Sequence, residues 1–261
     1  KKNVARNQVV IASKVYFNEG RLSKQAIMRE IDGTLSRLGT DYLDLYIIHR
    51  FDYDTPIEET MEALHDLVKA GKVRALGASA MYGYQFYNMQ LAARDNGWTP
   101  FSAMENHYNL LYREDERELL PICKQMKVSL MPYSPLAAGH LARPQWKSES
   151  LRGTTDRVAM GKYDKTEAED MQIVKRVAEL AEKYNCKMSQ IAIAWQWAKG
   201  ILSPIIGATK TQYLDDSAGA FDIKLTAEDL AYLEEPYVPH EIVGAIDKNP
   251  AQGVILLDEK K

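Results

Sequence analysis

The sequence lacks most of the features that mark disulfide-rich, membrane-spanning or nucleic-acid-binding proteins. Cysteine is scarce: the 261 residues contain two, far apart and without a CxxC motif, which favours a reduced, cytoplasmic setting. No apolar run approaches the ~20 residues of a transmembrane helix, and no apolar segment follows the basic N-terminal residues, so neither a membrane span nor a signal peptide is expected. The net charge of −3 gives no reason to expect nucleic acid or an anionic membrane as a partner.

Two common kinds of binding motif are also absent. No GxGxxG segment follows a strand-like run, which argues against a Rossmann nucleotide site. The five histidines show no HxH or HExxH spacing, so we propose no metal site.

What the sequence does contain is a regular alternation of strand-like and helix-like segments. Short apolar runs rich in β-branched and aromatic residues are typical of buried parallel strands. Strands that alternate with helices imply a parallel sheet in an α/β domain. The predicted strands are Gln8–Val15, Tyr42–Ile48, Val73–Ala78, Phe101–Met104, Val128–Pro132 and Ser203–Ile206, and a helix is predicted after each, with an additional one before the last strand and another after the final strand–helix unit.

Several helix ends carry recognisable signals. Ser23 is expected to cap the first helix and Gly39 to close it. Other predicted helix starts are Thr55 as a cap with Pro56 at the first helical position, the capping box Thr166–Glu169, and Thr226 with Asp229. The polar stretch His140–Lys165 is too long for an ordinary connection and is predicted to be a functional loop.

Distinctive polar residues follow each predicted strand. A doubly wound sheet gathers its ligand groups at one switch point, whereas an α/β barrel gathers them from every strand end. This pattern favours a barrel, although a barrel of this type needs eight units and six are counted. His49 ends the apolar run Tyr42–Ile48, and its position alone is equally consistent with a catalytic residue and with a packing histidine. The strand-end residues are Lys14, His49, Ser79, Glu105, Ser134 and Thr209.

Several long motifs, in order, resemble those of the aldo-keto reductases. They are VVIASKV, LGTDYLDLYIIHR, TPIEETMEALHDLVKAGKVRALGAS, YNLLYRE, YSPLAAG and IIGATK. The ending EEPYVPH, at Glu234 to His240, is similar to the bacterial and fungal branch related to the potassium-channel β subunits. The resemblance implies a (β/α)8 TIM barrel that binds NADPH and reduces aldehydes or ketones, with residues 1–261 as a single domain.

The resemblance also implies that the chain lacks the family's N-terminal hairpin and first two βα units, leaving six of eight. That segment carries two members of the catalytic tetrad, an aspartate and the proton-donating tyrosine. The open sheet edges that would result favour aggregation or association with a second copy, a possible homo-oligomer.

Lys14 and His49 match the other two members of the tetrad. The family role of Lys14 is to lower the pKa of the tyrosine through its ammonium group, and His49 would donate a hydrogen bond to the substrate oxygen. An exposed strand-end lysine is the alternative for Lys14.

The remaining matches concern the cofactor. Ser79 and Glu105 lie where relatives hold the nicotinamide amide, although Glu105 replaces a glutamine and Ala80 replaces an asparagine; Tyr133 would stack on the nicotinamide ring. Ser134, Leu136 and Gly139 match the pyrophosphate loop. Arg143 and Arg152 are weaker phosphate candidates. The turn that holds the 2′-phosphate matches Gly207, Ala208, Thr209, Lys210 and Gln212, followed near the adenine by Asp215 and Asp216.

Two functions remain open from the sequence. The first is NADPH-dependent reduction of a small carbonyl substrate. The alternative is a non-catalytic NADP(H)-binding module, suggested by the departures at Ala80 and Glu105 and by the missing tyrosine. The protein is expected to be cytoplasmic and to have neither nucleic acid nor a membrane as a partner.

Overall fold

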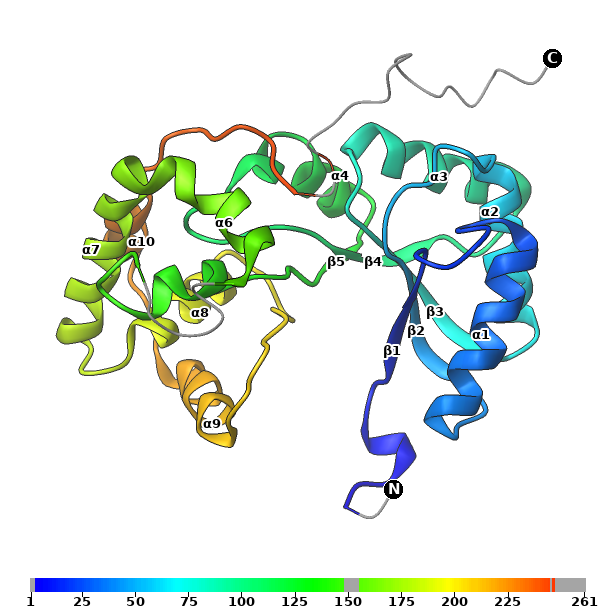
Figure 1. Cartoon of the computed structure of the whole chain (residues 1–261), viewed down its shortest axis with the longest axis horizontal. Helices are drawn as coiled ribbons and strands as arrows, with labels where there is room; N and C mark the ends of the chain where they lie inside the picture. Colours follow the sequence, from blue (N-terminus) through cyan, green and yellow to red (C-terminus); the bar gives the residue numbers. More distant parts are fainter. Residues whose placement is uncertain (1–2, 148–154, 245, 247–261) are drawn as a thin grey trace. The chain divides into compact units, whose positions relative to one another are not determined.

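The computed structural model describes residues 3–147, 155–244 and 246 (Figure 1). The fold is α/β, with parallel strands connected by helices. It contains two compact units. One holds the described residues up to Glu105 together with Ile122–Val128, and the other holds Asn106–Pro121 and the described residues from Ser129 onward. Among the described residues, no helix is both long and apolar enough to cross a membrane.

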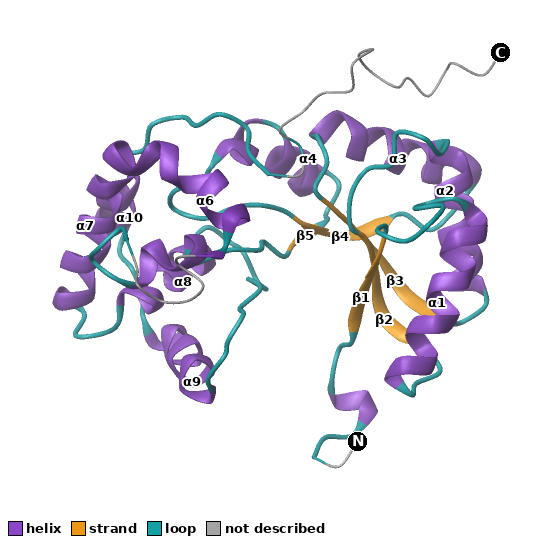
Figure 2. Cartoon of the chain, viewed as in Figure 1, coloured by secondary structure: helices purple, strands orange, loops and turns teal. Residues whose placement is uncertain are grey.

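The first unit is built on four strands that pair in parallel and in chain order. The helices α1 to α3 pack along the same side of this sheet, as Figures 1 and 2 show. The strands are β1 (Ala12–Val15), β2 (Leu43–Ile48), β3 (Val73–Ser79) and β4 (Phe101–Glu105); the helices are η1 (Arg6–Gln8), α1 (Lys24–Leu38), α2 (Ile57–Lys69) and α3 (Gly83–Asn96).

The first long helix begins and ends where its sequence predicts. The Ser23 hydroxyl accepts a hydrogen bond from the N–H of Ala26, which satisfies one of the helix's free donors. Gly39 ends the helix with a left-handed backbone (φ 62°), which glycine adopts at little cost. Ile27 and Ile31 are buried on the inner face. The cap and the apolar stripe together direct α1 onto the sheet.

The two faces of this sheet differ in what covers them. Successive side chains of a strand point to opposite faces. On β2, Tyr46 faces α1: burial raises the pKa of its hydroxyl, and the charge of Glu30 on α1 adds to that increase. Ile47 and the residue after the strand, His49, therefore point to the other face, away from α1.

The second unit is mainly helical around a buried apolar core. Trp195 is completely buried beside Tyr108, with their ring centroids 5.1 Å apart. Figure 2 shows the surrounding helices. Its elements are η2 (Glu114–Arg117), the start of α4 (Leu119–Gln125), β5 (Ser129–Leu130), η3 (Ala137–Ala142), α6 (Arg157–Tyr163), η4 (Asp164–Thr166), α7 (Glu167–Lys183), α8 (Met188–Ala198), α9 (Thr211–Gly219), η5 (Ala220–Asp222) and α10 (Ala227–Glu234).

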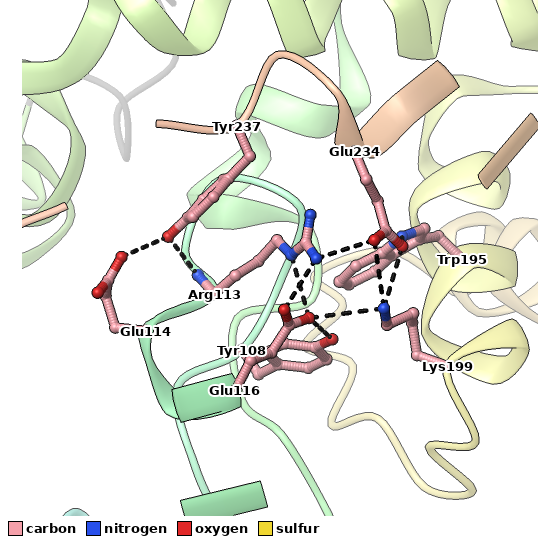
Figure 3. Close-up of polar contacts among 8 residues, drawn as sticks. All are labelled: Tyr108, Arg113, Glu114, Glu116, Trp195, Lys199, Glu234 and Tyr237. Atoms are coloured by element: carbon pink, nitrogen blue, oxygen red, sulfur yellow. Dashed lines mark hydrogen bonds and ion pairs between the residues drawn. The ribbon is translucent and has the colours of Figure 1, made fainter. Parts of the chain in front are cut away.

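A charged network fastens the end of α10 to the segment after β4 (Figure 3). Arg113 lies 2.8 Å from both Glu116 and Glu234. Lys199 on α8 lies 3.2 Å from Glu234, and the indole of Trp195 donates to the same carboxylate. Two cations thus face two carboxylates in a partly buried setting, where paired charges with satisfied donors are tolerated.

The structure differs from the sequence-based predictions at several segments. Ser203–Ile206 forms no regular strand, although the Ile205 N–H donates to the Pro132 carbonyl. The first strand begins at Ala12 rather than Gln8, because Arg6–Gln8 forms a 3-10 turn. The fifth strand shrinks to Ser129–Leu130, and the helix predicted from Glu114 to Lys124 divides into η2 and α4.

Two helix starts were predicted incorrectly because a nearby carboxylate takes the capping hydroxyl. The Thr55 hydroxyl donates to Asp52, and Pro56 is the cap of α2. The Thr166 hydroxyl bonds to Asp170 and to the Tyr163 carbonyl instead of capping α7. The long stretch His140–Lys165 also contains helical structure, including α6, in its described part.

Candidate active site

The four site residues predicted on the first unit gather on one face of its sheet. In the pairing register, Lys14 lies opposite Ile47, Ile47 opposite Gly77, and Gly77 opposite Ala103. Paired residues share a face, as do residues two apart on one strand. Lys14, His49, Ser79 and Glu105 therefore lie at the carboxyl ends of four neighbouring strands, on the face opposite α1.

Lys14 and Glu105 form an ion pair across this face. The Lys14 Nζ lies 3.0 Å from the Glu105 Oε1, and the glutamate side chain is 7% exposed against 32% for the lysine. Burial raises the pKa of the Glu105 carboxyl, and the Lys14 ammonium partly opposes that increase. The Ser79 hydroxyl donates to the Glu105 carbonyl at 2.7 Å, which fixes the backbone at this strand end.

His49 is held as a neutral imidazole beside this pair. Burial lowers its pKa, and the positive charges of Lys14 and Arg50 lower it further. At neutral pH the ring therefore carries one N–H and no net charge, which suits it to donate a hydrogen bond to a carbonyl oxygen.

An aromatic residue that the sequence analysis did not single out covers the His49 ring. The Phe17 ring meets His49 edge-on, with centroids 4.8 Å apart, and the Arg50 guanidinium lies 5.0 Å from the Phe17 centroid. Phe17 is 63% exposed. The signal in the sequence that could have identified Phe17 is an apolar aromatic residue in the otherwise polar loop directly after β1.

Within the second unit, two predicted cofactor segments line one groove of about 220 Å³. The wall after β5 has left-handed backbone at Ser134 (φ 57°) and Gly139 (φ 100°). A Cβ added at Gly139 would lie 2.7 Å from the Arg143 guanidinium, so only glycine fits there without displacing the arginine. The lining residues are Ser134, Pro135, Leu136, Ala138, Gly139, Ile205, Ile206 and Gly207.

Arg143 forms hydrogen bonds to the backbone of this turn. Its guanidinium donates to the carbonyls of Gly139 and Trp146 at 3.0 and 3.2 Å. That Arg143 contacts a phosphate, the weaker of the cofactor assignments, remains a prediction. Arg152, the other such candidate, lies outside the described residues.

Tyr133 already has aromatic and cationic neighbours. Its ring stacks on His107 with centroids 5.2 Å apart, and the Lys162 ammonium lies 4.6 Å from its centroid. The stacking of Tyr133 on a nicotinamide ring remains a prediction.

The predicted 2′-phosphate turn is exposed and leads into a helix. Lys210 is the cap residue of α9, and its Nζ lies 5.8 Å from the centroid of Tyr213, an exposed aromatic residue that the sequence analysis did not single out. Asp216 pairs with Lys187 at 2.6 Å. The predicted members Gly207, Ala208, Thr209, Gln212 and Asp215 are also exposed.

No cluster of three or more histidine, cysteine, aspartate or glutamate side chains suited to a metal ion occurs within the described ranges.

Ala80, next to Ser79, stands where the family that the chain resembles has an asparagine. Its backbone is left-handed (φ 46°), a conformation that asparagine and glycine tolerate better than alanine. Ala80→Gly and Ala80→Asn should both raise the midpoint of thermal unfolding by a few degrees. On the sequence-based expectation of an NADPH site, only Ala80→Asn should tighten binding of that cofactor, by roughly three- to tenfold, the value of one neutral hydrogen bond. Melting curves and cofactor titrations check both; equal affinities for the two variants would contradict an amide contact here.

A parallel α/β fold that gathers polar side chains at the carboxyl ends of its strands is consistent with an α/β barrel. The chain belongs to the aldo/keto reductase family, whose model matches residues 1–237.

Its curated relatives include several fungal proteins. An aldo-keto reductase of Fusarium vanettenii is 46% identical over 89% of this chain and 62% of its own length. Versiconal hemiacetal acetate reductase of Aspergillus parasiticus is 41% identical over 93% of this chain and 77% of its own length. An aldo-keto reductase of Alternaria alternata is 44% identical over 86% of this chain. The chain spans about three fifths of the length of the Fusarium and Alternaria relatives.

Proposed function

We propose that the protein containing this chain reduces aldehydes or ketones to alcohols with NADPH as the hydride donor. The observation that carries the proposal is the strand-end site of the first unit, where Lys14 and the neutral His49 share one face of the sheet. Family membership and the reductase names of its relatives support it.

In this proposal the protein residues act on the substrate oxygen and on proton transfer. His49 donates a hydrogen bond to the carbonyl oxygen, where negative charge develops during reduction. The Lys14 ammonium stabilises the ionised form of a neighbouring proton donor, since an adjacent positive charge lowers the pKa of an acid. The cofactor, when bound, supplies the hydride.

Candidate cofactor residues occur in each unit, taken by itself. In the first unit, the Ser79 hydroxyl is proposed for the amide end, since the Glu105 carboxylate is paired with Lys14. In the second unit, the groove with Gly139 and Gly207 offers backbone that a pyrophosphate can approach closely. Ser134 and Leu136 line the same groove. The exposed turn at Lys210 holds the 2′-phosphate in this proposal.

Cofactor choice gives a separate prediction. Lys210→Ala should weaken NADPH binding about tenfold or more, because a charge-assisted hydrogen bond contributes roughly 1.5–3 kcal/mol. NADH binding should remain nearly unchanged, since NADH has no 2′-phosphate. Calorimetric titration of both cofactors measures the effect, with Lys175→Ala on α7, another exposed lysine, as the matched control. Equal losses for NADPH and NADH would contradict the assignment.

A second candidate, a non-catalytic NADP(H)-binding module, is favoured by the side chains at the nicotinamide position. Glu105 is engaged by Lys14, and Ala80 offers no amide. The decisive assay mixes the full-length protein with NADPH and 4-nitrobenzaldehyde and follows the absorbance of NADPH. Sustained turnover above a no-enzyme control supports the reductase, whereas tight NADPH binding without turnover across a panel of aldehydes supports the module.

A further inference from the structure

The strand-end site contains a carboxylate for which the family pattern gives no role in proton transfer. Glu105 occupies the position of a family glutamine, and a glutamate accepts hydrogen bonds but cannot donate one to an amide oxygen. In the structure this carboxylate faces the Lys14 ammonium at 3.0 Å.

The pair forms across two intervening strands, and the sheet leaves room for it. The row that contains Lys14 continues through Ile47 to Gly77 and Ala103. Gly77 has no side chain, so the lysine can extend over β3 toward the end of β4. A Cβ at Gly77 would lie 3.0 Å from Ile47, a contact tighter than normal packing.

The position of Glu105 is fixed rather than adjustable. Its side chain is 7% exposed, and the hydrogen bond from Ser79 anchors its backbone carbonyl. The Lys14 side chain is more exposed and is flexible by nature, with four rotatable carbons. A buried carboxylate on a rigid strand end can therefore select one position for the ammonium of a flexible lysine.

We propose that Glu105 is a positioning residue for proton transfer, which holds the Lys14 ammonium at the strand ends through this ion pair and thereby sets the acid side of the reaction's pH range. The proposal rests on the proposed reductase function. Within the part of the chain that the structure describes, the other charged or titratable groups that act on this site are His49 and Arg50, which follow β2.

The pH dependence follows from the carboxyl group. Burial raises the pKa of Glu105 above its usual value. The ion pair exists while Glu105 is ionised, so it is complete well above that pKa and is lost as the pH falls through it. His49, whose pKa is lowered, stays neutral over the same upper range.

Glu105→Gln tests the proposal, because the amide keeps the shape and removes the charge. The lysines of the protein are reductively dimethylated with ¹³C-formaldehyde and a borane reductant, which preserves their positive charge, and the Lys14 signal is assigned with Lys14→Arg. In the wild type, this signal should move as the pH falls through the range in which Glu105 protonates. In Glu105→Gln that movement should be lost. Glu62→Gln, which removes one of the two carboxylate partners of the exposed Lys24, is the matched control and should leave the Lys14 titration unchanged.

Steady-state kinetics provide the second readout. Glu105→Gln should lower kcat about tenfold or more, since small displacements of a catalytic group are costly, and should flatten the acid limb of the pH profile. Its NADPH affinity should stay within about twofold, and Glu105→Asp should retain part of the acid limb.

Two results would overturn the proposal. One is a Lys14 signal whose titration is the same in the wild type and in Glu105→Gln. The other is tighter NADPH binding by Glu105→Gln with an unchanged pH profile, which would assign Glu105 to the nicotinamide amide. If the protein turns over no carbonyl substrate, the proposed function fails, while the Lys14 titration still decides whether the ion pair exists.

Discussion

Replacing Lys14 with methionine should lower kcat/KM for aldehyde reduction by about 10²–10⁴, the usual contribution of acid–base catalysis. Methionine keeps an unbranched chain that is one atom shorter and removes the ammonium, so the proton donor loses the charge that lowers its pKa. NADPH affinity should change little. Steady-state kinetics with 4-nitrobenzaldehyde and a cofactor titration measure the two quantities separately.

Two controls separate this effect from a loss of structure. Lys69→Met replaces an exposed lysine at the end of α2 and should leave kcat/KM unchanged. The double variant Lys14→Met with Glu105→Gln removes the unpaired buried carboxylate as well, so it should recover stability without recovering activity. Activity of Lys14→Met within threefold of the wild type would show that Lys14 is an ordinary strand-end lysine.

Replacing His49 with alanine should lower kcat by about 10²–10³, the range found when one donor to a developing oxyanion is removed. Because burial and the neighbouring positive charges lower the His49 pKa, the imidazole stays neutral at and above neutral pH. The wild-type kcat should therefore show no ionisation from His49 between about pH 7 and 8. A pH series of kcat for both proteins measures the loss and its pH dependence.

His65→Gln is the matched control for that experiment. His65 lies on α2 and bonds to Thr99 at 3.0 Å, on an element that covers the other side of the sheet. It should retain wild-type kcat. If His49→Ala and His65→Gln lost activity equally, the His49 effect would be attributable to packing rather than to the substrate oxygen.

The sequence predicted those helix ends that are fixed by hydrogen bonds between residues close together in the chain. The cap of α1 at Ser23, its end at Gly39 and the start of α10 at Thr226 with Asp229 in its first turn are confirmed. These features depend on hydrogen bonds between residues three or four apart. The strand ending before His49 is also confirmed, because a short β-branched run has few alternatives.

Features that depend on distant residues were not predictable. The edge-on contact of Phe17 with His49 joins the loop after β1 to the residue that follows β2. The Lys14–Glu105 pair depends on the register of four strands and on the missing side chain at Gly77. Sequence spacing contains no direct information about either, so the site residues could be named while their partners could not.

The most direct test of the account is the transfer of deuterium from NADPH labelled with deuterium on both positions of C4. The full-length protein is incubated with this cofactor and 4-nitrobenzaldehyde, and the alcohol product is analysed by mass spectrometry, with Lys14→Met alongside. The account predicts one deuterium on the alcohol carbon for the wild type and a strongly reduced yield of labelled alcohol for Lys14→Met. Binding of the labelled cofactor without any deuterated alcohol would contradict the reductase and support a binding module.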